Sequence, residues 1–406
     1  MRAVFAPLRH RGFRRVWTGQ LVNVVGDAVF VVAVPLYLLP RPDAATAIGS
    51  VLAAAALGGV VSLLVGGALA DRHRRSRIIV GSDLVRAAGL GLVLLAGPQG
   101  SLWLLVAGAA TTGIGAGVYR PAYLALLPTL VPACELAGAT ALRSLTSRFA
   151  GVLGSLLGGL LVVWWQPRAV LALDLVTFLV SILTLVGLAD RAPERGNGGS
   201  LARDVADGVR FVLRRPWMSA VMGQGMLQVA LVSGPVAVCL PLLLGAHGAW
   251  YGIALAAEAA GAIGGASLAA TRGSTRPGLV ALLALLAQAP QLLAMALGAG
   301  PPLLVAASAL AGVGAAVFAV VWTTALQRQV PADHLGRVMA MDQLTATALS
   351  PVGLALAGWA VAGLGVAPVA WSAAAVLVLS VLAVLPVPRV LTFGRPVPDA
   401  AASRPR

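Results

Sequence analysis

Two carboxylic acids, Asp27 and Glu258, stand in the middle of long apolar stretches of the chain. Asp27 follows Gln20 and Asn23 by seven and four residues, a spacing that places the three side chains on one face of a helix. Glu258 lies in "YGIALAAEAAGAIGG", where its neighbours are mainly Ala and Gly. Ionisable groups are costly inside a membrane and usually line a cavity, so we predict that both acids bind and release protons. The alternatives are a packing role for Asp27 and a buried ion pair between Glu258 and Arg120.

Other polar side chains are sparse along the apolar stretches. Arg120, in "GVYRPAY", is placed to attract an anionic substrate, to balance Asp27 or Glu258, or to extend to the membrane surface. A small set of side chains is predicted to contact a substrate: Gln20, Asn23, Arg120, Tyr123, Gln224 and Gln228. Such a sparse set indicates a largely apolar site.

Several chemistries are excluded by what the sequence lacks. All 29 basic residues are arginine, so there is no lysine for ATP phosphates or for a Schiff base. The four histidines lie in predicted tails or links, and the two cysteines lack the spacing of metal ligands. We therefore predict no catalytic residues, no metal, no cofactor and no enzyme activity.

The elements that carry these residues are predicted to be membrane helices. Of the 406 residues, 59% are hydrophobic and only 11% are charged. Apolar runs of about 20 residues, enough to cross roughly 30 Å of hydrocarbon as a helix, recur along the whole chain. Counting them predicts an all-α membrane protein with twelve transmembrane helices, at residues 14–39, 46–70, 78–97, 101–127, 137–163, 168–189, 216–243, 249–270, 277–297, 301–327, 337–362 and 366–387.

The arginines predict the orientation of these helices. If the N-terminus is cytoplasmic, nearly all of them lie at the inner face, and only Arg41 and Arg168 lie outside. We therefore expect a multi-pass protein of the cell membrane with both termini in the cytoplasm. The net charge of +15 suits anionic lipid head groups at the inner face. No basic surface with interleaved aromatic residues indicates nucleic acid, and we expect a monomer.

The chain divides into two similar halves. We predict an N-terminal six-helix half at 1–189, a cytoplasmic linker at 190–215, a C-terminal six-helix half at 216–388 and a cytoplasmic tail at 389–406. In the linker, apolar residues recur at helical spacing opposite charged ones, which indicates a helix lying in the membrane interface; an unstructured tether is the alternative. "LVPACELAG" at 130–138 is echoed by "QVPADHLGR" at 329–337, so the halves are predicted to be pseudo-symmetric.

One loop resembles a family signature. "GGALADRHRRSR", at 66–77, resembles the loop between the second and third helices of the major facilitator superfamily, with Gly67, Asp71, Arg72 and Arg75 in the matching positions. Arg74 stands where the family usually has glycine, and Ser76 where it usually has a base. The resemblance implies the major facilitator fold and a cytoplasmic gate formed by the four matching residues.

Further stretches resemble the branch that contains siderophore and macrolide exporters: "FRRVWTGQLVNVVGD" at 13–27, "GSDLVRA" at 81–87, "YRPAYLALLPTLVP" at 119–132 and "LQRQVPADHLGRV" at 326–338. The resemblance implies a secondary active transporter. We predict proton-coupled efflux of a small amphipathic molecule of drug, macrolide or siderophore type by alternating access, which makes the chain an antiporter and a candidate for drug resistance.

Three other functions stay open. The fifth helix reads "GVLGSLLGG" and lacks the Gly-Pro pair of the family's antiporter motif, which weakens the assignment of antiport. A uniporter or an importer of a small metabolite is therefore an alternative. A membrane receptor or scaffold that transports nothing is another, but it would leave two acids in the membrane without a role.

Overall fold

A computed structural model describes residues 2–70, 72–188, 190, 201–247, 249–271 and 274–393. Within these ranges the chain forms helices and short connections, and no strand. The first half consists of α1 (Arg2–Phe5), η1 (Ala6–Arg9), α2 (Arg11–Leu38), α3 (Ala44–Ala70), α4 (Arg75–Ala96), α5 (Leu102–Leu126), η2 (Leu127–Thr129), η3 (Ala133–Glu135) and α6 (Leu136–Leu185).

A short helix, α7 (Leu201–Leu213), precedes the second half. The second half consists of α8 (Pro216–Gln228), η4 (Val229–Ser233), α9 (Gly234–Leu244), η5 (Gly245–His247), α10 (Trp250–Thr271), α11 (Pro277–Leu285), η6 (Leu286–Gln288), α12 (Ala289–Ala296), α13 (Pro301–Gln329), α14 (Ala332–Ala348), α15 (Ser350–Leu364), α16 (Val366–Val384) and η7 (Val390–Thr392).

Eleven helical segments of the described chain are long and apolar enough to cross a membrane. The longest of them, at 133–185, contains two crossings, because Trp165 and Gln166 leave the helical conformation and the backbone of Gln166 has a φ of 51°. Pro167 follows at once, and a proline disfavours helical backbone in the residue before it. The twelve predicted helices and their all-α architecture are thereby confirmed.

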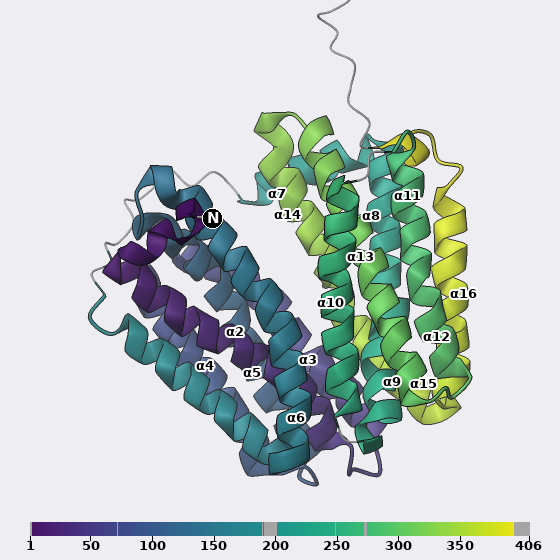
Figure 1. Cartoon of the computed structure of the whole chain (residues 1–406), viewed down its shortest axis with the longest axis horizontal. Coiled ribbons are helices and arrows are strands. Elements are labelled where there is room, and N and C mark those ends of the chain that lie inside the picture. The colour runs from purple at the N-terminus through teal and green to yellow at the C-terminus, as the bar shows by residue number, and fades with distance from the viewer. Residues whose placement is uncertain are drawn as a thin grey trace, which may run out of the picture.

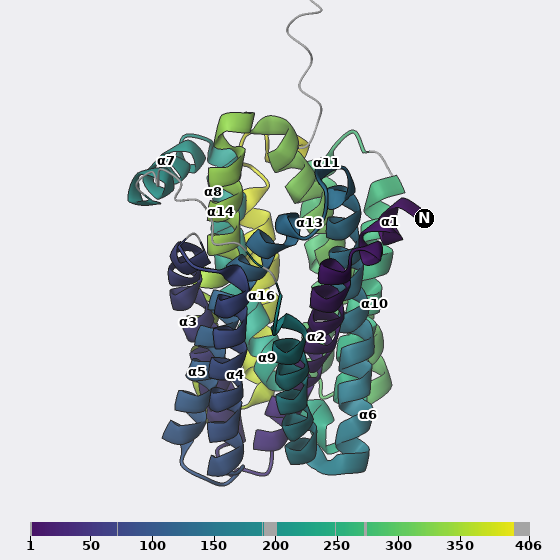
Figure 2. The same ribbon diagram turned by 90° about the vertical axis from the view of Figure 1, so that its left-hand side faces the viewer.

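The helices form two bundles that lean against each other (Figures 1 and 2). We call the end where α2 begins, at Arg11, the N-terminal face, and the end where α2 finishes, at Leu38, the far face. The main contacts between the halves are those of α3 with α15 and of α6 with α10. These contacts involve the beginnings of α3 and α10, which lie toward the far face.

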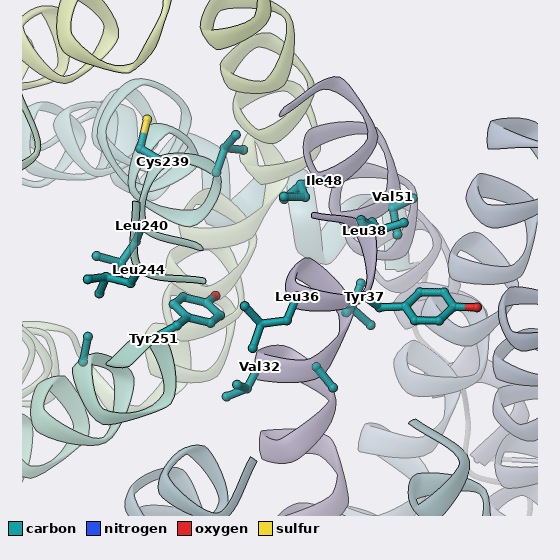
Figure 3. Packing of buried hydrophobic residues seen from close by; sticks show 14 of the residues in the cluster. Val32, Leu36, Tyr37, Leu38, Ile48, Val51, Cys239, Leu240, Leu244 and Tyr251 are labelled. Carbon is teal, nitrogen blue, oxygen red and sulfur yellow. The ribbon is translucent and has the colours of Figure 1, made fainter. Parts of the chain in front are cut away.

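The clusters of buried apolar residues also differ between the far face and the N-terminal face. A single cluster joins the two halves: it combines Val32 and Leu36 of α2 with Leu240 of α9 and Tyr251 of α10 (Figure 3). Among the described residues, three further clusters each belong to one half. One surrounds Phe13 and Leu126 in the first half; in the second half, one surrounds Trp217, Trp322 and Phe393, and a smaller one includes Leu292 and Leu377. The halves therefore share a core toward the far face and keep separate cores toward the N-terminal face.

The linker contains the helix that its pattern suggested. α7 packs against α8 and α14, and Figure 1 shows it beside α14 at the N-terminal face. Phe211 and Val212 of α7 are buried in the core of the second half. Its position at a membrane surface stays a prediction, as do the domain limits.

Candidate transport site

Glycines form the contact between the halves. A Cβ atom on Gly252 of α10 would lie 2.5 Å from the Cα atom of Gly159 in α6, and one on Gly49 of α3 would lie 2.7 Å from the Cα atom of Gly358 in α15. Only residues without a side chain let two helix backbones approach this closely. We call these four residues the glycine seam. It closes the space between the halves toward the far face.

A cavity of about 230 Å³ lies between the halves beside this seam. Residues from both halves line it: Val31, Pro35, Leu52, Ser233, Val236, Ala237, Tyr251, Leu255, Glu258 and Gln288. Ser233 ends a π-helical turn in the seventh crossing, a local distortion that is frequent at functional sites. The lining is mainly apolar with a few polar groups, the composition typical of sites for small organic molecules.

Glu258 is the charged residue of this cavity. It shares one face of α10 with Leu255 and Tyr251, three and seven residues earlier, which also line the cavity. Among the described residues it forms no hydrogen bond and no ion pair. The alternative of a buried pair between Glu258 and Arg120 is therefore wrong: Arg120 lies in the other half with its side chain exposed.

Asp27 lies near this cavity, in α2 of the first half. It precedes the cavity residue Val31 by one helical turn, and its side chain is 47% exposed although it lies near the middle of α2. Its carboxylate forms an ion pair with Arg86 of α4. The alternative in which Arg120 balances Asp27 is therefore wrong.

Behind Asp27, Arg86 holds a buried polar cluster together. Its guanidinium donates a hydrogen bond of 3.0 Å to the Asn23 amide oxygen and lies 3.6 Å from the carboxylate of Asp83. It also lies over the ring of Phe178, 4.3 Å from the centroid, a favourable cation–π contact. Asn23 is itself buried, and its amide nitrogen donates a hydrogen bond of 3.4 Å to Asp83. In this conformation both polar atoms of the Asn23 side chain therefore form hydrogen bonds within the cluster.

Two carboxyl groups of this cluster were not singled out from the sequence. Asp83 of α4 is fully buried and accepts a hydrogen bond of 2.6 Å from the Ser181 hydroxyl. Asp174, in the second part of α6, accepts one of 2.9 Å from the Thr177 hydroxyl. The signal that could have found them is the one that found Asp27, an ionisable residue within an apolar stretch.

The remaining predicted substrate contacts lie outside the cavity of Glu258. Gln20 accepts a hydrogen bond from the Tyr119 hydroxyl. Tyr123 is buried and stacks on Tyr119, with ring centroids 5.9 Å apart. In the second half, Gln224 is buried, and Gln228 donates a hydrogen bond of 2.9 Å to Ser380. A substrate role for these residues and for Arg120 stays a prediction.

The predicted gate is described in part. Asp71 lies outside the described residues. Arg72 is exposed, Arg75 begins α4, and a Cβ atom on Gly67 would meet no other group within 4 Å. One contact fixes this end of α4: the Asp190 carboxylate accepts the backbone N–H of Ser76 at 2.9 Å, which caps the helix from the end of the first half.

Comparison with known proteins identifies the architecture. The family model of the Major Facilitator Superfamily matches residues 16–287. The chain belongs to the major facilitator superfamily. It is also 30% identical, over 97% of its length and 96% of theirs, to proteins named "Enterobactin exporter EntS" from Shigella boydii serotype 18 and Escherichia coli O1:K1. The predicted family and branch are thus confirmed, and the chain is a multi-pass membrane transporter rather than an enzyme.

Solved structures of the superfamily share this fold. The nucleoside transporter NupG aligns with a TM-score of 0.73 at 11% identity, covering 92% of this chain and 98% of NupG. The peptide transporter POT in complex with sulfate aligns with a TM-score of 0.69 at 15% identity, covering 94% and 95% of the two chains. A bacterial homologue of the lysosomal transporter Spinster, in an inward-facing and unoccupied conformation, aligns with a TM-score of 0.63 at 16% identity, covering 96% of this chain and 99% of that one. At these identities the likeness concerns the fold alone.

Proposed function

We propose that this chain is a proton-coupled exporter of small amphipathic molecules of the siderophore type. The single observation that carries the proposal is the place of Glu258, a carboxyl group without an ion-pair partner among the described residues, in a mainly apolar cavity built by both halves. A carboxyl group exposed first to one aqueous phase and then to the other can bind a proton from one and release it to the other. The exporter names of the full-length relatives support the direction and the class of substrate.

Alternating access would start from a conformation in which the halves touch toward the far face. The seam and the shared core join the halves toward the far face, whereas toward the N-terminal face the buried apolar clusters of the described residues are separate. If the termini lie in the cytoplasm, as the arginines predict, this conformation is open inward and ready to take a substrate from the cell. Rocking of the halves about the cavity would break the seam and close the N-terminal face. Gly67, Asp71, Arg72 and Arg75 would form the gate there.

The mainly apolar lining favours an amphipathic substrate. The Glu258 carboxylate, with Tyr251 and Ser233, supplies the few polar contacts that orient a ligand. The cavity is smaller than the roughly 300–1,000 Å³ of ordinary small-molecule sites, so a substrate of siderophore size must extend from it toward the N-terminal face. Drugs and macrolides are the second class of candidate substrates, because an apolar lining does not distinguish them strongly.

The test is transport by purified protein in liposomes under an imposed pH gradient. The probes are a catecholate siderophore and a macrolide, each with the gradient in both directions. We expect Glu258→Gln to bind the probe but to lose accumulation against its concentration gradient, because the amide cannot exchange a proton. Glu135→Gln is the matched control, since Glu135 lies in the short helix η3 before α6, away from the cavity, and contacts His10.

The outcomes separate the candidate functions. Full gradient-driven accumulation by Glu258→Gln would refute the role of Glu258. Probe movement by the wild-type chain that does not respond to the gradient would identify a uniporter. Accumulation driven in the opposite direction would identify an importer, and binding without any movement would identify a receptor.

A further inference from the structure

The buried cluster behind Asp27 contains more acid than base. Asp27 and Asp83 flank the guanidinium of Arg86, and Asp174 lies one helical turn before Phe178, over whose ring that guanidinium lies. If all three were ionised, the cluster would carry a formal charge of −2 inside the membrane. Isolated ionised carboxylates cost several kcal/mol or more in such surroundings, so an arrangement of this kind is stable only when a proton or another cation reduces the charge.

The surroundings of the three acids differ. Asp27 has the ion pair with Arg86 and the open side of the cluster. Asp83 has the Ser181 hydroxyl, the Asn23 amide and the nearby guanidinium. Asp174 is 2% exposed, has one hydrogen bond on its first carboxyl oxygen, and has no partner among the described residues on its second, Oδ2. Of the three, Asp174 is the acid whose charge is least compensated.

Close packing limits the room for a larger cation at the first carboxyl oxygen of Asp174. A Cβ atom on Gly26, the residue before Asp27, would lie 2.3 Å from the first carboxyl oxygen of Asp174 and 2.5 Å from the Thr177 hydroxyl. The backbone of α2 thus covers the Asp174 carboxyl directly. A proton fits such a site, since it adds no volume.

We propose that Asp174 is a second, inner proton-binding site, which exchanges its proton with Asp27 as the Arg86 guanidinium moves from one carboxylate to the other. In the described conformation Arg86 pairs with Asp27 and the proton is on Asp174, so the cluster carries a charge of −1. When Asp174 passes its proton to Asp27, Arg86 is released from Asp27 and pairs with the inner acids, and the charge of the cluster stays −1. Asp27 then exchanges that proton with the space around its exposed side chain.

The other ionisable group that faces the cluster is Tyr119 of α5. Its ring lies 5.8 Å from the Arg86 guanidinium, and its hydroxyl donates to Gln20. Donation to an amide oxygen holds the phenol in its neutral form, so Tyr119 takes no part in the exchange. The groups that exchange a proton are therefore confined to α2, α4 and the second part of α6. The role of this exchange in transport rests on the proposed proton coupling. The spectroscopic test of the exchange does not depend on transport.

The test is infrared spectroscopy of the full chain in lipid nanodiscs at neutral pH, without any substrate. A protonated carboxyl group absorbs through its C=O stretch in a region free of amide bands. We expect one such band to disappear in Asp174→Asn. The band should change its frequency in Thr177→Val, which removes the hydrogen bond to Asp174 but keeps the acid and most of the side-chain volume. Glu135→Gln, which removes an acid that contacts His10 and lies outside the cluster, should leave the band unchanged.

Asp27→Asn gives the decisive result. With the charge on Asp27 removed, the cluster reaches −1 with Asp174 ionised, so the Asp174 band should disappear although Asp174 itself is intact. A merely structural Asp174 would not respond to a change at Asp27. A band unaffected by Asp174→Asn, or lost in Asp174→Asn but kept in Asp27→Asn, overturns the exchange.

Transport measurements separate this inference from the proposed function. If the infrared pattern is as expected but the wild-type chain moves no probe in response to a pH gradient, the site exists and the proposed coupling is wrong. If the wild-type chain is driven by the gradient and Asp174→Asn is driven equally well with an identical pH profile, the inner site is wrong and the coupling stands. Gly26→Ala, which pushes a methyl group into the Asp174 carboxyl, should impair the gradient response with both acids present.

Discussion

A methyl group added at Gly252 should open the far face. The new Cβ atom would lie 2.5 Å from the Gly159 Cα atom and 2.6 Å from the Ser155 carbonyl oxygen, and both are backbone atoms that cannot rotate away. Ordinary van der Waals contact begins at 3.4 Å, so α6 and α10 must separate by about 1 Å. Because α6 belongs to the first half and α10 to the second, the strain falls on the conformation in which these helices touch.

The size of the effect follows from overpacking. Inserting a methylene group into a close-packed contact costs about 1–3 kcal/mol. The alternative conformation, with the far face open, does not have this contact and is spared the cost. The equilibrium between the two should therefore shift about 5- to 150-fold toward the conformation that is open at the far face.

The assay is the distribution of distances between two spin labels at the far face. Ser101, before α5, and Gly300, before α13, are exposed and belong to different halves. Cys134 is exposed and must be replaced, whereas Cys239 is buried. In Gly252→Ala, a population at longer distance should grow at the expense of the shorter one.

Gly264→Ala is the matched control on the same helix. A Cβ atom there would meet nothing within 4 Å, and the gain in helix propensity of about 1 kcal/mol is the same at both sites. If Gly252→Ala and Gly264→Ala give the same distance distribution as the wild-type chain, the seam does not control the opening and the reasoning fails.

Two further predictions concern the ends of helices. Asp190→Ala should lower the thermal stability of the purified protein by about 1 kcal/mol, because it removes the acceptor that caps the Ser76 N–H at the start of α4; an unchanged melting temperature would contradict the capping role. At the far face, the hydrogen bond from Arg41 lowers the pKa of the Asp43 carboxyl. A lowered pKa stabilises the fold above the unfolded pKa, and this stabilisation is lost as the pH falls through the folded pKa. The difference in stability between the wild-type chain and Asp43→Asn, roughly 0.2–1 kcal/mol for a pair whose carboxyl group is exposed, should therefore disappear in acid. A gap that widens on acidification would contradict the pairing.

The sequence predicts most of the fold because the bilayer leaves few choices. A chain in hydrocarbon must form helices of about 20 residues, and the apolar runs show where they lie. The sequence does not predict two details of backbone conformation that depend on local packing. The left-handed backbone of Gln166, just before Pro167, and the π-helical turn at Val229–Ser233 have no signal in the hydrophobic pattern.

Part of the candidate site was also predictable from the apolar runs. An acid in an apolar run is visible from sequence alone, and Asp27 and Glu258 were found in this way. The partner of Asp27 was not found: Arg86 lies in the middle part of α4 (Arg75–Ala96), and the spacing of residues along α4 does not show that this part meets Asp27. Which of two arginines reaches Asp27 depends on how α2, α4 and α5 pack, and the spacing along the chain does not contain that information.

The positions of the seam and the cavity on α10 have a consequence for how such a chain can evolve. Gly252 touches the opposite backbone, whereas Leu255 and Glu258 line the cavity. Mutations that alter the cavity can therefore accumulate without disturbing the contact that joins the two bundles. A new ligand preference can arise by exchanging a few cavity residues, while the glycines of the seam tolerate almost no exchange.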